Sequence, residues 1–97
     1  MVKHIVMWRL HDEALGKTCA QNANLLKQKL EALSGKIPGL LKIEVGFDDR
    51  AGADIVLYSE LESREALEAY RTHPEHQAVI PLVKSVTADR RVVDYEV

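Results

Sequence analysis

Residues 40–61, LLKIEVGFDDRAGADIVLYSEL, decide the fold. Apolar side chains alternate with polar ones over residues 40–47, and this period of two is typical of a half-buried β-strand. Residues 48–52 combine polar side chains with a glycine and predict a turn. Residues 53–61 alternate again, with large apolar side chains on both parities. The stretch therefore predicts two paired strands, of which the second is the more deeply buried.

On the N-terminal side, residues 3–10 predict another strand that is apolar on both parities. The period then lengthens over residues 14–37, where apolar side chains recur at steps of three and four. This spacing predicts one long helix that ends at Gly35 and Pro38. Its apolar face consists of Cys19, Ala23, Leu26, Leu30, Leu33 and Ile37.

On the C-terminal side, Ser63 is a favourable N-cap for a short helix that His73 and Pro74 interrupt. A second helical piece is predicted over residues 75–86, and residues 90–97 alternate as a last strand. The order β–α–β–β–α–β predicts a ferredoxin-like α+β sandwich with an antiparallel sheet in the order 4-1-3-2.

Two helices can cover only one face of a four-stranded sheet. Because the two central strands carry large apolar side chains on both parities, the other face would expose an apolar patch. A second copy of the sheet packed face to face would cover that patch. We therefore predict a homodimer formed through the sheet face.

Composition narrows the classes of partner. The chain has 97 residues, a formal charge of −2, and neither a basic excess nor an aromatic platform that would bind nucleic acid. No apolar run approaches the ~18 residues of a membrane span. The single cysteine, Cys19, fits a reducing compartment. We expect one cytoplasmic domain, residues 1–97, without nucleic-acid or membrane partners.

Five segments in order, VKHIVMWRL (2–10), IPGL (37–40), EVG (44–46), LEAYRTHPEHQAV (67–79) and VVDYEV (92–97), resemble the stress-responsive A/B barrel domain (Dabb) family from end to end. The resemblance implies a dimeric α+β barrel of ferredoxin-like protomers. The best-defined chemistry of the family belongs to a plant branch that cyclises polyketides by aldol condensation.

His76 is the leading candidate for chemistry, because an imidazole can exchange a proton near neutral pH. Helical spacing places it on one face with three apolar residues, Val79, Ile80 and Val83. The resemblance to the cyclase branch implies that His76 is a general base and that Tyr70 stabilises the developing oxyanion. The structural alternative is a half-buried histidine bonded to a backbone carbonyl at the Pro74 break.

His4 and Asp54 are two further candidates. His4 shares the parity of Val6 and Trp8 in a central strand, where a polar ring needs a partner. If that parity faces the helices, His4 could line one pocket with His76, as the resemblance implies; a capped histidine at the strand end is the alternative. Asp54 stands where the cyclase branch has a histidine, and we expect it to pair with His4 or His76.

These residues predict a small-molecule pocket between helices and sheet. Its apolar wall would be Trp8, Val79, Ile80 and Val83, and its polar end Tyr70, His76, His4 and Asp54. As an enzyme it would need no cofactor, with His76 removing a proton next to a carbonyl group. The alternatives are a dimeric binding or stress-protective module without turnover and a cofactor-free monooxygenase.

A metal site formed by His73, His76 and His4 is not expected. The spacing of these histidines is loose, and no cluster of cysteine or glutamate supports it.

Overall fold

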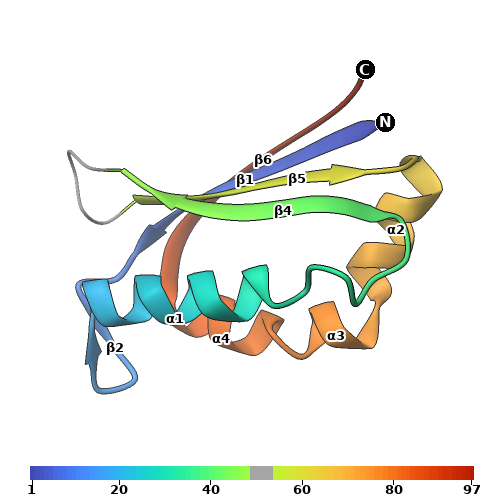
Figure 1. The fold of residues 1–97 in the computed structure, drawn as a ribbon. Coiled ribbons are helices and arrows are strands. Elements are labelled where there is room, and N and C mark those ends of the chain that lie inside the picture. Colours follow the sequence, from blue (N-terminus) through green and yellow to red (C-terminus); the bar gives the residue numbers. More distant parts are fainter. Residues whose placement is uncertain (49–53) are drawn as a thin grey trace.

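Four long strands form one antiparallel sheet in the order β4-β5-β1-β6, and all the helices lie on one of its faces (Figure 1). The coordinates are a computed structural model that describes residues 1–48 and 54–97. The elements are β1 (Val2–Leu10), β2 (Glu13–Ala14), β3 (Lys17–Thr18), α1 (Cys19–Glu31), β4 (Leu40–Phe47), β5 (Asp54–Leu61), α2 (Arg64–Thr72), α3 (Pro74–Gln77), α4 (Ile80–Val86) and β6 (Thr87–Glu96). The predicted ferredoxin-like α+β fold and its strand order are confirmed.

The core lies between the sheet and the helices. Along β1 the even-numbered side chains face the helices, and Val6 is paired with Leu57 of β5 and Val92 of β6. Leu26 and Leu30 of α1 are buried against this face. Since successive side chains of a strand point to opposite faces, the odd-numbered side chains of β1 belong to the outer face of the sheet.

The first helix is shorter than predicted. Instead of spanning residues 14–37, α1 begins at Cys19 and ends at Glu31. Leu15 and Gly16 have φ angles of 55° and 73°, which a right-handed helix excludes, and they form the tip of the β2–β3 hairpin. Thr18 and Gln21 then form a capping box that starts the helix.

The second helical region is divided more than predicted. The piece expected over residues 75–86 consists of α3 and α4, with a break after Gln77. Pro81 explains the break, because a proline inside a continuous helix would lose its hydrogen bond to the carbonyl of Gln77 and clash with it. The last strand begins at Thr87, three residues earlier than predicted. Apart from Asp48, the predicted turn at residues 48–52 lies outside the described residues.

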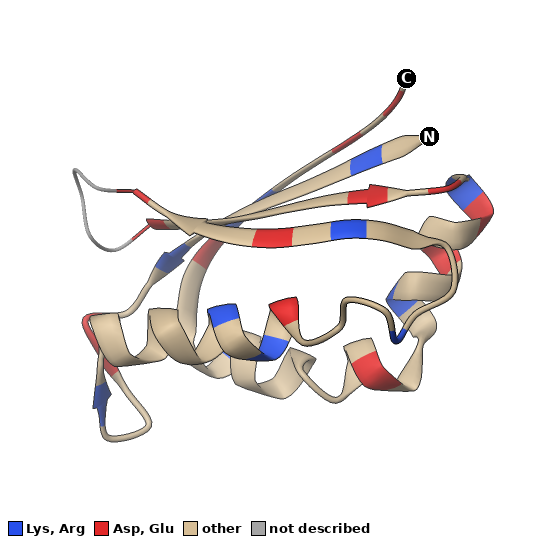
Figure 2. Ribbon diagram, in the orientation of Figure 1, with Lys and Arg blue, Asp and Glu red and all other residues tan. Residues whose placement is uncertain are grey.

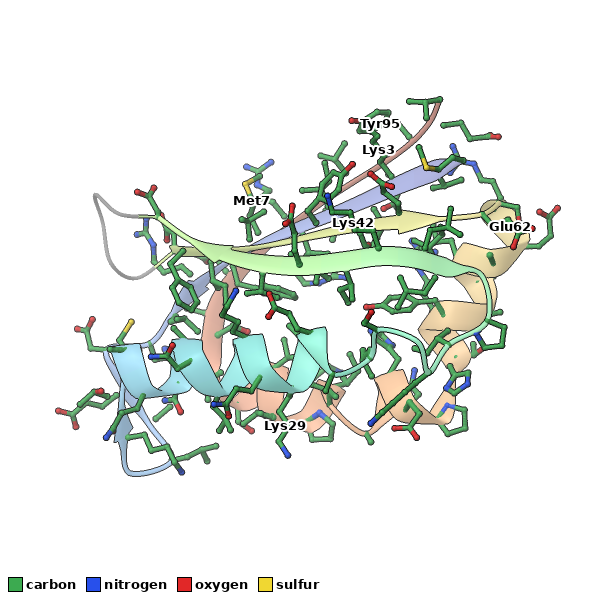
Figure 3. The ribbon with its side chains drawn as sticks, viewed as in Figure 1. Lys3, Met7, Lys29, Lys42, Glu62 and Tyr95 are labelled. Carbon is green, nitrogen blue, oxygen red and sulfur yellow. The ribbon has the colours of Figure 1, made fainter. Side chains whose placement is uncertain are left out.

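The outer face of the sheet carries exposed apolar side chains. Lys3, Met7, Lys42 and Tyr95 project from the side of the sheet away from the helices (Figure 3). Met7 is 49% exposed, and Val93, which is paired with Ile5, is 52% exposed. This face combines large apolar side chains with charged ones, and no described helix or strand packs on it (Figure 1).

Gly39 provides a test of how the helical layer is fixed to the sheet. It has a φ of +85°, and a Cβ atom placed there would lie 2.7 Å from the Cβ of Ala66 in α2. Gly35 has a φ of +79° with nothing within 4 Å of such an atom, and is the matched control. Gly35→Ala should lower the free energy of unfolding by about 1 kcal/mol through backbone strain alone.

Gly39→Ala should lower it by about 1–3 kcal/mol more, because the added methyl group overpacks the contact with α2. Urea unfolding at one protein concentration measures both values. Equal losses for the two variants would contradict the close approach of Gly39 to α2.

Candidate functional site

A cavity of about 420 Å³ lies between the helix-facing side of the sheet and the helices. Its wall combines apolar side chains with polar side chains from β1, α2, α3, α4 and β6. The lining residues are His4, Val6, Trp8, Leu30, Leu57, Tyr70, Arg71, His76, Gln77, Ile80, Val83, Lys84, Thr87 and Arg90. This size and composition are typical of a small-molecule site.

His76 lies on α3, whose start is fixed by Pro74 and by the His73 side chain, which accepts a hydrogen bond from the backbone N–H of Glu75. The Nδ1 atom of His76 lies 3.2 Å from the carbonyl oxygen of Arg71. Because a carbonyl only accepts, Nδ1 carries the hydrogen of the neutral ring and Nε2 has the free lone pair. Among the described residues Nε2 has no hydrogen-bond partner.

Burial lowers the pKa of His76, and the hydrogen bond from Nδ1 to the Arg71 carbonyl opposes this shift. The imidazole is therefore neutral at pH 7, since its pKa lies below the ordinary value of 6.5. A neutral imidazole with a free Nε2 can accept a proton. The carbonyl contact expected for a structural histidine is thus present, and it also sets the tautomer that a base requires.

Tyr70 lies on α2 beside His76, with ring centroids 4.3 Å apart. The tyrosine is fully buried, and its hydroxyl has no hydrogen-bond partner among the described residues. Burial raises the pKa of Tyr70 to about 12. The phenol therefore stays protonated and can donate a hydrogen bond to a ligand oxygen in the cavity.

His4 is 4% exposed and has the partner that its burial requires. Its Nδ1 lies 2.5 Å from a carboxylate oxygen of Asp94, the residue opposite it on β6. The other carboxylate oxygen of Asp94 accepts a hydrogen bond from Arg71 at 2.7 Å. Since the carboxylate accepts at Nδ1, the Nε2 atom of His4 is directed away from Asp94. The His4 and Tyr70 rings lie 5.9 Å apart in an edge-on arrangement.

Sequence reasoning missed Asp94 and Arg71. A signal was available for Asp94, because the predicted sheet order places the last strand beside the first and a buried histidine needs a partner. Arg71 could be found only once Asp94 and the end of α2 were placed in space.

Asp54 is not part of the cavity. Its carboxylate accepts a hydrogen bond from Arg9 at 3.3 Å, and the two residues are paired across β5 and β1 on the outer face. The expectation that it pairs with His4 or His76 is therefore wrong. Asp54 follows the outward parity of β5, because Ile55 and Leu57 are the buried residues there.

The predicted apolar wall is largely assembled. Trp8, Ile80 and Val83 line the cavity, whereas Val79 is buried beside α4 and is not among the lining residues. The indole Nε1 of Trp8 is buried without a hydrogen-bond partner among the described residues. Together with the Tyr70 hydroxyl, it is one of two buried donors of the cavity-lining residues that have no partner in the described part of the chain. In the described part of the chain, no three His, Cys, Asp or Glu side chains are grouped closely enough to hold a metal ion.

The family follows from a comparison that covers nearly the whole chain. Residues 2–97 match the model of the Stress Responsive A/B Barrel Domain, Dabb. The chain belongs to the Dabb family. No protein with a curated description matches this Dabb chain. Among the described residues, no helix is long and apolar enough to span a membrane.

Solved structures share the Dabb fold. A dimeric protein of unknown function from Bacteroides fragilis with a ferredoxin-like fold has 38% identity and a TM-score of 0.87, over 99% of this chain and 95% of its own. A dimeric ferredoxin-like protein of unknown function from Thermobifida fusca has 23% identity and a TM-score of 0.82, over 99% of this chain and 90% of its own. SnoaB from Streptomyces nogalater, a cofactor-independent oxygenase, has 9% identity and a TM-score of 0.79, over 99% of this chain and 91% of its own. The last two likenesses show the fold alone.

The unpartnered hydroxyl of Tyr70 leads to an unusual stability prediction. A buried hydroxyl without a partner costs about 1–3 kcal/mol, so Tyr70→Phe should leave the free energy of unfolding unchanged or raise it. Tyr58→Phe is the control, because the Tyr58 hydroxyl donates to Glu60 at 2.5 Å, and loss of that hydrogen bond should lower the free energy of unfolding. Urea unfolding at a fixed protein concentration compares them. A loss above about 1 kcal/mol for Tyr70→Phe would contradict an unpartnered hydroxyl.

Proposed function

We propose that the chain forms a homodimer through the outer face of its sheet. Three observations support this. The face is uncovered by any described element, it carries the exposed side chains of Met7, Val93 and Tyr95, and the relatives from Bacteroides fragilis and Thermobifida fusca are described as dimeric. Two such faces packed together would remove this apolar surface from water.

Val93→Asp should convert the dimer to a monomer, because it places a charge at a position paired with Ile5 in the middle of the proposed interface. Leu15→Asp is the matched control: Leu15 is 58% exposed but lies on the β2–β3 hairpin, away from the sheet. Sedimentation equilibrium measures the molar mass of both. A dimeric Val93→Asp variant would place the interface elsewhere.

We further propose that the cavity is the active site of a cofactor-independent enzyme that removes a proton from a carbon next to a carbonyl group. The observation that carries the proposal is the contact between His76 and Tyr70. A neutral imidazole with a free Nε2 and a buried phenol with a free O–H line the same cavity, with ring centroids 4.3 Å apart. One group accepts a proton and the other donates a hydrogen bond.

The step follows from these roles. Nε2 of His76 takes the proton as the C–H bond breaks, and the electron pair moves to the carbonyl oxygen, which becomes an enolate oxygen. The Tyr70 hydroxyl donates to that oxygen in a site shielded from water, where such a bond stabilises developing charge most. The imidazolium exchanges its proton with solvent and then protonates the enolate carbon. Alternatively, the enolate carbon attacks a second carbonyl carbon of the same ligand, and the imidazolium gives its proton to the oxygen of that carbonyl as its C=O π bond opens.

A binding module without turnover is the second candidate, and the apolar wall favours it as much as it favours an enzyme. The two differ in whether bound ketones exchange protons. The monooxygenase interpretation rests on fold likeness, and the described residues add no further observation to it.

Proton exchange tests the enzyme directly. The protein should accelerate exchange of the α-protons of 1-phenylpropan-2-one with D₂O, followed by NMR. His76→Gln should lower this rate by about 10²–10⁴-fold, because a glutamine side chain cannot act as the base. His11→Gln is the control, since His11 is exposed in the loop after β1. Quenching of the single tryptophan, Trp8, by the ketone without any acceleration would favour the binding module.

The pH profile of the same reaction gives an independent readout. The rate should rise with pH through a pKa below 6.5, as His76 loses its proton, and should then stay level. It should fall only near pH 12, where the Tyr70 phenol ionises. An acid limb centred above pH 7 would contradict the assignment of His76 as the base.

A further inference from the structure

We propose that the cavity selects amphipathic anions, and that Arg90 and Lys84 bind the carboxylate or phosphate head group of the ligand at its mouth. This inference rests on the proposed small-molecule site and names the chemical class that the site takes. The ligand's apolar body would lie on Trp8 and Ile80, with its reacting carbonyl group at Tyr70.

The charged side chains that line the cavity are all cationic among the described residues, and the nearby carboxylate of Asp94 is bonded to His4 and Arg71. Arg71, Lys84 and Arg90 line the cavity, and no Asp or Glu is among the described lining residues. The chain as a whole has 15 acidic and 13 basic side chains, and they are spread over strands and helices alike (Figure 2). The cationic lining therefore differs from the average surface of the molecule.

Two of the three cations are free to bind a ligand. Arg71 donates to Asp94 and to Glu68, each at 2.7 Å, so its charge is already compensated. Neither Arg90 nor Lys84 has a carboxylate partner among the described residues. An unpaired arginine presents a planar fork of donors that matches the two oxygens of a carboxylate or phosphate.

The cavity has a buried apolar part and an exposed cationic part. Val6, Leu30 and Leu57 are buried and form its apolar part, whereas Lys84 on α4 and Arg90 on β6 are exposed. Arg90 is paired with Trp8 across β6 and β1, so its backbone lies next to the wall of the cavity. A ligand with an apolar body and a charged end would place each part in a matching environment.

Electrostatics agree with this placement. Burial is the main reason that the pKa of His76 is lowered, and the positive charges of Arg71 and Arg90 contribute to the same shift. Arg90 is thus within electrostatic reach of the proposed base. An anionic head group at Arg90 and a carbonyl group at Tyr70 would lie in the same cavity.

The outer face offers a contrast. A groove of about 530 Å³ at one end of the sheet is also lined by Trp8 and Arg90, but among its described lining residues the charges are balanced, with three arginines and three aspartates. They are Arg9, Arg90 and Arg91 and Asp48, Asp54 and Asp89. Lys84 lines only the inner cavity and Arg91 only the outer groove, so these two residues distinguish the sites.

Trp8 fluorescence reports binding, because Trp8 is the only tryptophan and lines the cavity. The probes are 4-phenylbutyrate, 3-phenylpropyl phosphate and the neutral 4-phenylbutanamide. We expect at least one anion to bind more tightly than the amide. Arg90→Gln and Lys84→Gln should each lower the affinity for that anion by about 3–10-fold and leave the affinity for the amide unchanged. The control Arg91→Gln, which changes the neighbouring residue of β6, should change neither.

Three results would overturn the inference. One is equal affinity of the wild-type protein for the amide and both anions, and another is no quenching by any probe. The third is weakening of the anion by Arg91→Gln but not by Lys84→Gln, which would place the ligand in the outer groove. The proposed proton abstraction is tested separately. If the protein does not select anions but His76-dependent proton exchange is observed, only this inference is contradicted. If the protein selects anions but shows no His76-dependent proton exchange, only the proposed chemistry is contradicted.

Discussion

The alternation of side chains along β1 is the constraint on which the rest of the structure depends. β1 is a central strand between β5 and β6, and the helices cover only one face of the sheet (Figure 1). Even-numbered side chains such as His4 and Trp8 therefore line the cavity, and odd-numbered ones such as Met7 lie on the outer face. A shift of one residue in the register would exchange the two sets, so this pairing decides both which side chains line the cavity and which lie on the outer face that we propose as the dimer surface.

The buried polar groups in the wall of the cavity divide into two kinds, and the division separates the groups that hold the wall in place from those that the proposed function assigns to a ligand. His4 and Asp94 satisfy each other, and Arg71 completes the pair, so this network holds its members in place. The Tyr70 hydroxyl and the Trp8 indole N–H have no hydrogen-bond partner in the described part of the chain. An unpartnered buried donor costs stability, and a protein retains that cost most readily where a ligand supplies the missing acceptor.

Much of the fold could be predicted from periodicity alone, because apolar side chains recur every two residues in a half-buried strand and every three to four residues in a helix. β4 was predicted with its observed bounds, and the sheet order followed from the order of elements. The errors came from local backbone chemistry: Leu15 and Gly16 adopt positive φ angles before α1, and Pro81 interrupts the last helix. Such features change where an element ends without changing its place in the sheet.

The site was harder to predict, because it depends on which face of a strand a side chain occupies. The sequence left open whether His4 and His76 share one pocket, and in the structure both line the same cavity. The parity of β1 places His4 there, whereas the position of His76 depends on how the short helix α3 packs, which helical spacing alone does not give. Asp54 was assigned wrongly, because the family resemblance placed it in the pocket although the parity set by Ile55 and Leu57 directs it to the outer face. Asp94 shows the opposite case. Asp94 is paired with His4 across two strands that lie far apart in the sequence, so no local spacing of residues indicates this contact.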